Sequence, residues 1–219
     1  MHKGSLIKNT VRLATLLLIA AVLSSCAGFP FLTKADDFHR SSLEGIPAES
    51  NQVLLVTDDH FLFLNFRKIF PFEKKGLSWR QAMEPMDVVI GRNGFAPVGA
   101  KREGDGRTPS GLYRLGLVFG YAETAATQMP YRQALRDDLW IDDPEAPDYN
   151  RWVKTGETVA SSYEKMRRDD DLYKYGIVIE YNTSPVITNF GSAIFLHVWA
   201  GPRSKTAGCV ALAEADILK

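Results

Sequence analysis

A histidine and a cysteine close to the end of the chain have the residue types of a base and a nucleophile. His197 and Cys209 lie twelve residues apart in the segment HVWAGPRSKTAGCVAL. The thiolate is the reactive form of cysteine, and the pKa of an unperturbed cysteine is about 8.5. An adjacent imidazole takes the thiol proton during attack and later returns it to a leaving amine. The pair is therefore suited to nucleophilic catalysis.

The residues between the pair favour their meeting. GPRSK contains turn formers, so we expect it to reverse the chain and to return TAGC alongside the strand that carries His197. Gly208 lets the backbone approach a substrate closely and is free to take a conformation that other residues resist. The N–H groups of Gly208 and Cys209 are candidates to receive a developing oxyanion, and one such donor typically contributes about 10²–10³ in rate.

Alternation along SAIFLHVWA (192–200) predicts which way the imidazole points. Side chains of a strand alternate between two faces, so Phe195, His197 and Trp199 share one side. The residues between them are uniformly apolar and are expected to face the core. We therefore expect His197 to project from the exposed side as part of a groove wall. A half-buried structural histidine would give the same pattern, so that alternative stays open at this point.

The N-terminus has the pattern of a lipoprotein signal peptide over residues 1–25. A basic start precedes the apolar run LATLLLIAAVL, which is shorter than the roughly 20 residues that span a bilayer. No permanent transmembrane helix is therefore expected. The quartet ending in Cys26 resembles a bacterial lipobox, in which the cysteine is lipidated and becomes the mature N-terminus. An ordinary signal peptide with a coincidental cysteine is the alternative.

This N-terminus predicts a periplasmic protein that is anchored to a membrane through lipid on Cys26. No aspartate follows at the +2 position, which by resemblance favours the outer membrane of a Gram-negative bacterium. The chain has two cysteines, so Cys209 is left without a disulfide partner in an oxidising compartment. Such a cysteine is a candidate reactive thiol, and a buried inert cysteine is the other interpretation.

Composition indicates one folded domain, residues 51–219, behind a polar tether at 26–50. Hydrophobic residues make up 45% of the chain and aromatic residues 11%, which excludes a disordered protein. The 26 basic residues balance the 26 acidic ones, and no basic stripe indicates nucleic-acid binding. The segment RRDDD (167–171) is interpreted as a solvated surface run.

Apolar runs separated by turn residues predict a mainly β domain. VLLVT (53–57) and FLFLNF (61–66), separated by the polar DDH, predict a β-hairpin. MDVVIG (86–91) and GIVIEYN (176–182) predict further strands, and LAEADILK predicts a helix after the cysteine. The long insertion at 120–172 exceeds a plain connection and is expected to form a lid or a groove wall.

Several segments of the chain resemble one family. The order of His197 and Thr-Ala-Gly-Cys is similar to the signature of the YkuD-type L,D-transpeptidases, which are bacterial cell-wall enzymes. GAKREGDGRTPSGLYRL resembles the glycine-rich segment of that domain. DDLWIDDPEAPDYNRWV, LYKYGIVIEYN and GSAIFLH resemble the branch that carries a TAGC motif. The resemblance spans roughly residues 52–219.

The resemblance implies a β-sandwich-like catalytic domain that acts on peptidoglycan peptide stems. Cys209 would be the nucleophile, His197 the base, and Gly208 with Cys209 the oxyanion donors. The thiol would attack a tetrapeptide stem at the carbonyl after the L-centre of the diamino acid. The terminal D-alanine would leave, and an acceptor amine would resolve the thioester. No cofactor or metal is implied, and no oligomeric state follows from the sequence.

The resemblance also suggests residues around the pair. A backbone carbonyl orients the histidine in many relatives, and Gly191 and Ser192 are the candidates here. Ala207 and Ala211 stand where relatives often carry polar groups, which leaves the donor and acceptor preference open. The chain stops at Lys219, where relatives continue, so we expect a shortened or truncated end. Candidates for substrate contacts are Trp199, Arg203, Thr206 and Ser192.

Two alternatives to this function remain. The first is an L,D-carboxypeptidase, in which water replaces the acceptor amine. The second is a catalytically silent lipoprotein that keeps the groove and binds the cell wall. A zinc site formed by His60, His197 and Cys209 is not expected, because no close pair of ligands supports it.

Overall fold

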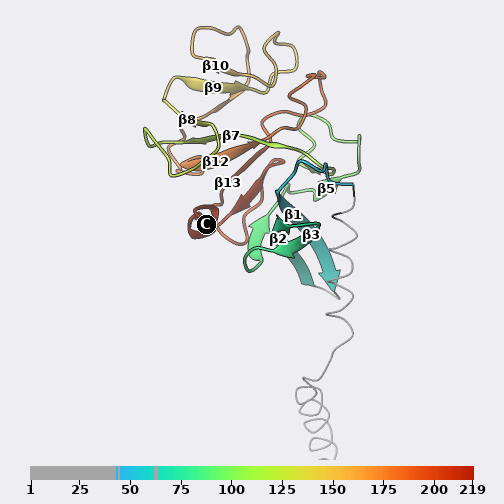
Figure 1. Ribbon diagram of the computed structural model, residues 1–219. Helices are drawn as coiled ribbons and strands as arrows, with labels where there is room; N and C mark the ends of the chain where they lie inside the picture. Colours follow the sequence, from blue (N-terminus) through green and yellow to red (C-terminus); the bar gives the residue numbers. More distant parts are fainter. Residues whose placement is uncertain (1–42, 44, 62–63) are drawn as a thin grey trace, which may run out of the picture. The chain divides into compact units, whose positions relative to one another are not determined.

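The structure is a computed structural model in which residues 43, 45–61 and 64–219 are described (Figure 1). The chain divides into two units, Met1–Ala48 and Glu49–Lys219, and every element below belongs to the second. The predicted signal peptide, Cys26 and the tether up to residue 42 lie outside the described residues. Within the described part, no helix is both long enough and apolar enough to span a bilayer.

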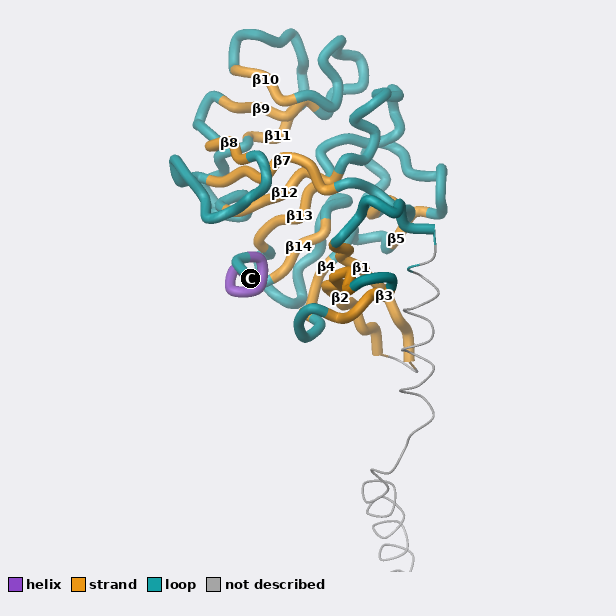
Figure 2. Tube along the Cα trace, in the orientation of Figure 1, coloured by secondary structure: helices purple, strands orange, loops and turns teal. Residues whose placement is uncertain are grey.

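The mainly β fold predicted from the sequence is confirmed, and its largest element is a nine-stranded sheet. The strands follow the order β1-β2-β4-β14-β13-β12-β7-β8, and β3 pairs with β2 outside this path (Figure 2). The strand bounds in sheet order are β1 (Gln52–Phe61), β2 (Leu64–Lys75), β3 (Ser78–Gln81), β4 (Met86–Val89), β14 (Val210–Leu212), β13 (Phe195–Val198), β12 (Tyr175–Ile179), β7 (Leu115–Gly120) and β8 (Tyr131–Gln133).

Two smaller sheets and one short helix complete the described elements. The three-stranded sheet has the order β10-β9-β11, and β5 pairs with β6 in the glycine-rich region. The helix predicted after the cysteine is present, but it is only four residues long. The bounds are β9 (Asp138–Ile141), β10 (Trp152–Lys154), β11 (Tyr163–Lys165), β5 (Phe95–Ala96), β6 (Thr108–Pro109) and α3 (Glu214–Ile217).

The predicted N-terminal hairpin exists, but its turn lies elsewhere than expected. Strand β1 continues to Phe61 and pairs with β2 so that Phe61 lies opposite Leu64. The polar triplet DDH therefore extends β1 instead of ending it. A polar residue is tolerated there because Asp58 lies directly across from Arg67, and the two side chains form an ion pair at 2.8 Å. The sequence rule that a polar triplet marks a turn therefore fails here, because the cross-strand ion pair stabilises an extended conformation at Asp58.

Both faces of the large sheet are covered at β13, which corrects one expectation about the active-site strand. All four residues of β13 are buried, so His197 does not project from an exposed side. The expected alternation is still present, because Leu196 packs in one apolar cluster and Phe195 in another. The cluster around Leu196 comprises Ile69, Met86, Val88, Ile90, Val210 and Leu212.

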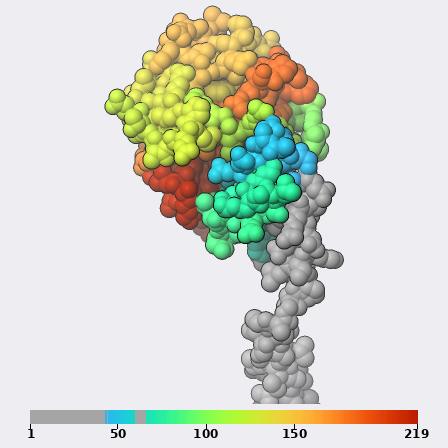
Figure 3. All heavy atoms as spheres, viewed as in Figure 1, coloured from blue at the N-terminus to red at the C-terminus, as the bar shows by residue number. Residues whose placement is uncertain are grey.

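The second cluster covers the His197 face, and the insertion at 120–172 supplies part of it. Phe119 and Phe195 from the sheet pack in this cluster with Trp140 and Met166 from the insertion. Ring contacts are edge-on, with centroids 5.0 Å apart for Trp140 and Phe195 and 5.3 Å apart for Phe119 and Phe195. In Figure 3, the insertion, coloured from yellow-green to orange, forms the end of the domain away from β1–β3.

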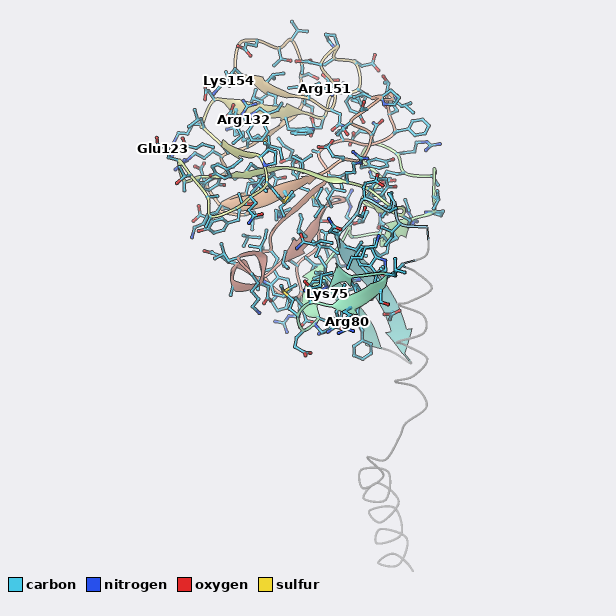
Figure 4. All side chains as sticks on the ribbon, viewed as in Figure 1. Lys75, Arg80, Glu123, Arg132, Arg151 and Lys154 are labelled. Atoms are coloured by element: carbon cyan, nitrogen blue, oxygen red, sulfur yellow. The ribbon has the colours of Figure 1, made fainter. Side chains whose placement is uncertain are left out.

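A buried carboxylate holds the insertion together. Asp138 is 1% exposed and accepts hydrogen bonds from the Leu135 amide and from Arg132. Lys154, on the neighbouring strand β10, forms a second ion pair with it at 3.1 Å. Figure 4 labels Arg132, on β8, and Lys154, on β10. A buried charge is tolerated only when it is compensated, so Asp138 must keep both cationic partners. The two ion pairs therefore hold β9 in place, and with it Trp140, which packs over the site.

Candidate active site

Cys209 follows a turn that one threonine closes. The Thr206 hydroxyl donates to the carbonyl of Cys209 at 2.6 Å and accepts a hydrogen bond from the Gly208 amide at 3.2 Å. The backbone of Thr206 is tied to the end of β4, because its carbonyl accepts from the Arg92 amide at 2.9 Å. The Cys209 carbonyl also accepts from Thr108 at 3.4 Å. These bonds hold the backbone around Cys209.

Gly208 is required for close packing and not for an unusual backbone angle. Its φ is not in the left-handed region, contrary to one reason considered from the sequence. A Cβ at this position would lie 3.0 Å from the Arg107 carbonyl and 3.1 Å from Ile194 Cδ1. Its amide is already hydrogen-bonded to Thr206, whereas the Cys209 amide has no hydrogen-bond partner in the described part of the chain. The Cys209 amide is thus the open donor for an oxyanion.

The connection from β13 to β14 differs from a simple reversal. The two strands are parallel, with Leu196 opposite Val210 and His197 opposite Ala211. Cys209 directly precedes β14, so by alternation its side chain lies on the same face as His197. The predicted return of TAGC alongside the strand is therefore correct, but the chain crosses over and enters β14 in the same direction as β13.

The Cys209 thiol is buried and hydrogen-bonded to the backbone. It is 7% exposed, accepts from the Phe195 amide at 3.3 Å and donates to the Ala193 carbonyl at 3.2 Å. Burial raises the pKa of the thiol to about 12. The thiol of Cys209 is therefore neutral at pH 7.

The imidazole of His197 is held in one tautomer by a backbone carbonyl. Its Nδ1 lies 2.7 Å from the carbonyl oxygen of Val198, and donation to that oxygen leaves Nε2 as the acceptor. The orienting group is thus neither Gly191 nor Ser192, the two candidates taken from the sequence. Burial lowers the pKa of His197 to about 4, so the ring is neutral at pH 7.

Both groups line one cavity of about 340 Å³. The Tyr173 ring contacts the imidazole edge-on, with centroids 5.2 Å apart, and forms part of the wall. A neutral thiol and a neutral imidazole on one face of a sheet can act together only through proton transfer during attack. The cavity therefore has the requirements of a nucleophile–base site.

Of the predicted substrate contacts, three line this cavity and one does not. Trp199 and Thr206 contribute to the wall, as does Ser192, whose hydroxyl donates to Glu103 at 2.6 Å. Arg203 is exposed and is not among the lining residues. The turn after β13 carries its side chain into solvent.

Sequence reasoning missed the charged side chains that the insertion brings to the cavity. Arg168 lines the wall, which corrects its assignment to a solvated run. Its guanidinium bonds Glu164 at 3.0 Å and both oxygens of Asp170, and the bonds to Asp170 raise its pKa. Burial raises the pKa of Glu164 and of Asp142, which also line the cavity. The sequence of the charged run RRDDD does not show that Arg168 lines the cavity, because that position depends on how the insertion folds.

Among the residues that the structure describes, no three His, Cys, Asp or Glu side chains are grouped so that they could hold a metal ion.

Comparison with known proteins gave one match. The family model described as the L,D-transpeptidase catalytic domain, YkuD, matches residues 65–219. No curated protein and no solved structure matches the chain. The matched range includes β13, β14, the turn between them and the insertion, and so contains both His197 and Cys209. The chain therefore belongs to the YkuD family of L,D-transpeptidase catalytic domains.

Proposed function

We propose that this protein is an L,D-transpeptidase that cuts and rejoins peptidoglycan tetrapeptide stems through a thioester on Cys209. The observation that carries the proposal is the placement of Cys209 and His197 on one face of parallel neighbouring strands, in one cavity. The lining also contains both cationic and anionic side chains, Arg168 and Glu164 among them. A stem peptide carries carboxylates, which a cationic side chain attracts, and an amine, which an anionic side chain attracts.

The acylation step follows from the neutral state of the pair. The Cys209 sulfur attacks the carbonyl of the diamino acid while its proton passes to Nε2 of His197. The carbonyl oxygen becomes an oxyanion that the Cys209 amide is placed to receive. Collapse of this intermediate breaks the amide bond, and His197 gives its proton to the departing D-alanine amine. The products are a thioester and free D-alanine.

The second half-reaction reverses these proton transfers. An acceptor amine attacks the thioester, loses a proton to His197 and forms a new amide, and the thiol is regenerated. Water in place of the amine gives a shortened stem, which is the carboxypeptidase outcome. The protein is further proposed to act in the periplasm, held at the outer membrane through lipid on Cys26, a proposal supported by the N-terminal sequence.

The test is incubation of residues 49–219 with disaccharide-tetrapeptide muropeptides, read by mass spectrometry. We expect loss of D-alanine, a thioester adduct on the wild-type protein, and no adduct on Cys209→Ala. His197→Gln should lower the acylation rate by at least about 10²-fold, because general-base catalysis contributes 10²–10⁴. Cross-linked dimers indicate transpeptidation, and shortened stems alone indicate hydrolysis. A wild-type protein that binds sacculi without adduct or product would overturn the enzyme and leave the wall-binding lipoprotein.

A further inference from the structure

The segment before β13 holds an alanine in a conformation that alanine rarely adopts. Ala193 has φ +52, in the left-handed region that glycine and asparagine favour. Such a residue persists only when its surroundings over-determine it, and it occurs preferentially at functional sites. Its carbonyl is the group that accepts the hydrogen bond from the Cys209 thiol, at 3.2 Å. The direction of this carbonyl therefore bears on the nucleophile.

A buried asparagine from the insertion holds Ala193. Asn150 is 2% exposed, and its Oδ1 accepts from the Ala193 amide at 3.1 Å and from Trp140 Nε1 at 2.7 Å. Its Nδ2 donates to the carbonyls of Tyr181 and Asn182, at 3.3 Å and 2.7 Å. All the side-chain polar atoms of Asn150 are thus engaged. The amide acts as a rigid bridge between the insertion and the strand that carries His197.

A second contact holds the two residues before Ala193. The Tyr149 hydroxyl donates to Glu103 at 2.6 Å and accepts from the Gly191 amide at 3.0 Å. Ser192 donates to the same oxygen of Glu103 at 2.6 Å. Two adjacent residues of the insertion, Tyr149 and Asn150, therefore clamp Gly191 to Ala193 from one side.

The thiol hydrogen bonds only to the backbone in the described part of the chain, and none of its bonds reaches His197. The Phe195 amide donates to sulfur and would favour a thiolate, whereas the Ala193 carbonyl accepts from sulfur and favours the thiol. We infer that Asn150 is a positioning residue for the nucleophile: through Ala193 it holds the sulfur in the cavity and directs the carbonyl that accepts the hydrogen bond of the thiol. This inference rests on the proposed role of Cys209 and adds a residue that the family signature does not contain.

The protonated state has a chemical use in the proposed compartment. A thiolate is the form that oxidants attack, so a nucleophile held as a thiol is protected between turnovers. When a stem carbonyl enters the cavity, the thiol exchanges its bond to the Ala193 carbonyl for proton transfer to His197. The Phe195 amide stays on sulfur throughout, so the loss of one hydrogen bond releases the nucleophile.

The test compares the pKa of Cys209 between variants from the rate of its alkylation by iodoacetamide at about pH 8, where the rate is proportional to the small thiolate fraction. It needs no substrate, and a fall of one pKa unit raises the rate about tenfold. Asn150→Gly removes the amide while glycine keeps the left-handed φ of +58 at that position. We expect the pKa of the thiol to fall by about one unit, the size of one lost hydrogen bond. We also expect the rate of acylation by a tetrapeptide to fall about tenfold with KM unchanged, because the sulfur loses its fixed position.

The matched control is Trp140→Phe, which removes the other bond to Oδ1 and leaves the bond from Ala193 in place. Its thiol pKa should equal that of the wild type even if its melting temperature falls as far as that of Asn150→Gly. Tyr149→Phe, which removes the hydrogen-bond acceptor of the Gly191 amide, should lower the pKa of the Cys209 thiol by a smaller amount. If Asn150→Gly does not fold, this variant tests the inference in its place, and an unchanged thiol pKa would overturn it.

The charged and titratable groups that line the cavity with the thiol are Lys101, Glu103, Asp142, Glu164, Arg168, Tyr173, His197 and Lys205, and all of these variants keep them. Tyr149→Phe also removes one hydrogen bond to Glu103. A thiol pKa that is unchanged in Asn150→Gly, or that moves equally in Trp140→Phe, would overturn the inference. Alkylation is read without substrate, so a protein that is inactive on every stem would contradict the proposed function and leave the pKa result standing.

Discussion

At the scale of single residues, burial sets the protonation of the proposed catalytic pair, His197 and Cys209. His197 is 6% exposed and Cys209 is 7% exposed, and burial disfavours the charged form of each. Burial lowers the pKa of His197 to about 4 and raises that of Cys209 to about 12. Both side chains are therefore neutral at every pH between these two values. A preformed thiolate–imidazolium pair is thus disfavoured, and the proton moves only during attack.

The pKa of His197 predicts how stability depends on pH. The folded value of about 4 lies below the usual 6.5, so the unfolded chain binds a proton first as the pH falls. The free energy of unfolding should therefore fall by up to about 3 kcal/mol between pH 6.5 and pH 4. His197→Gln should lose most of this slope. Urea unfolding at a series of pH values checks it, and a slope that is equal in both proteins would contradict it.

At the scale of elements, one glycine lets the strands around His197 pack. Gly176 on β12 lies opposite His197 on β13 and opposite Phe119 on β7. A Cβ at this position would overlap the ring of Phe119, which is fully buried. The aromatic ring thus occupies the space that a side chain on β12 would need. This arrangement fixes the ring beside Phe195, which packs against the site.

Gly176→Ala should therefore destabilise the domain by about 1–3 kcal/mol through overpacking. In a Phe119→Leu background the smaller side chain makes room, so the same substitution should cost less than half as much. Urea unfolding of the four proteins of this double-mutant cycle gives the coupling. Equal costs in both backgrounds would show that Phe119 is not the cause.

At the scale of the whole molecule, the insertion at 120–172 forms part of the wall of the cavity. It contributes Trp140 to the aromatic layer, Arg168 to the cavity and Asn150 to the segment before β13. The sequence predicted a lid or a groove wall. The structure shows that the insertion also contributes Trp140 and Met166 to the hydrophobic core. The site is thus assembled from the sheet and from a segment about 30–70 residues earlier in the chain.

The proposed lipid anchor is also a property of the whole protein. Expression in a Gram-negative host should place the wild type in the outer-membrane fraction and in the detergent phase of a Triton X-114 partition. Cys26→Ala should be soluble or remain as unprocessed precursor. Cys209→Ala is the matched control and should fractionate as the wild type does. A wild-type protein that is found in the soluble periplasm would contradict lipidation.

Residue types and their spacing are local properties, and they were enough to predict the mainly β class and the family and to single out His197 and Cys209 as a candidate pair. Only the folded chain shows that His197 is buried, that the Val198 carbonyl orients it and that Arg168 reaches the cavity. The alternation of side chains shows which residues of β13 share a face, but it does not show which other residues cover that face. The covering residues come from distant segments, and their burial sets the pKa values of His197 and Cys209.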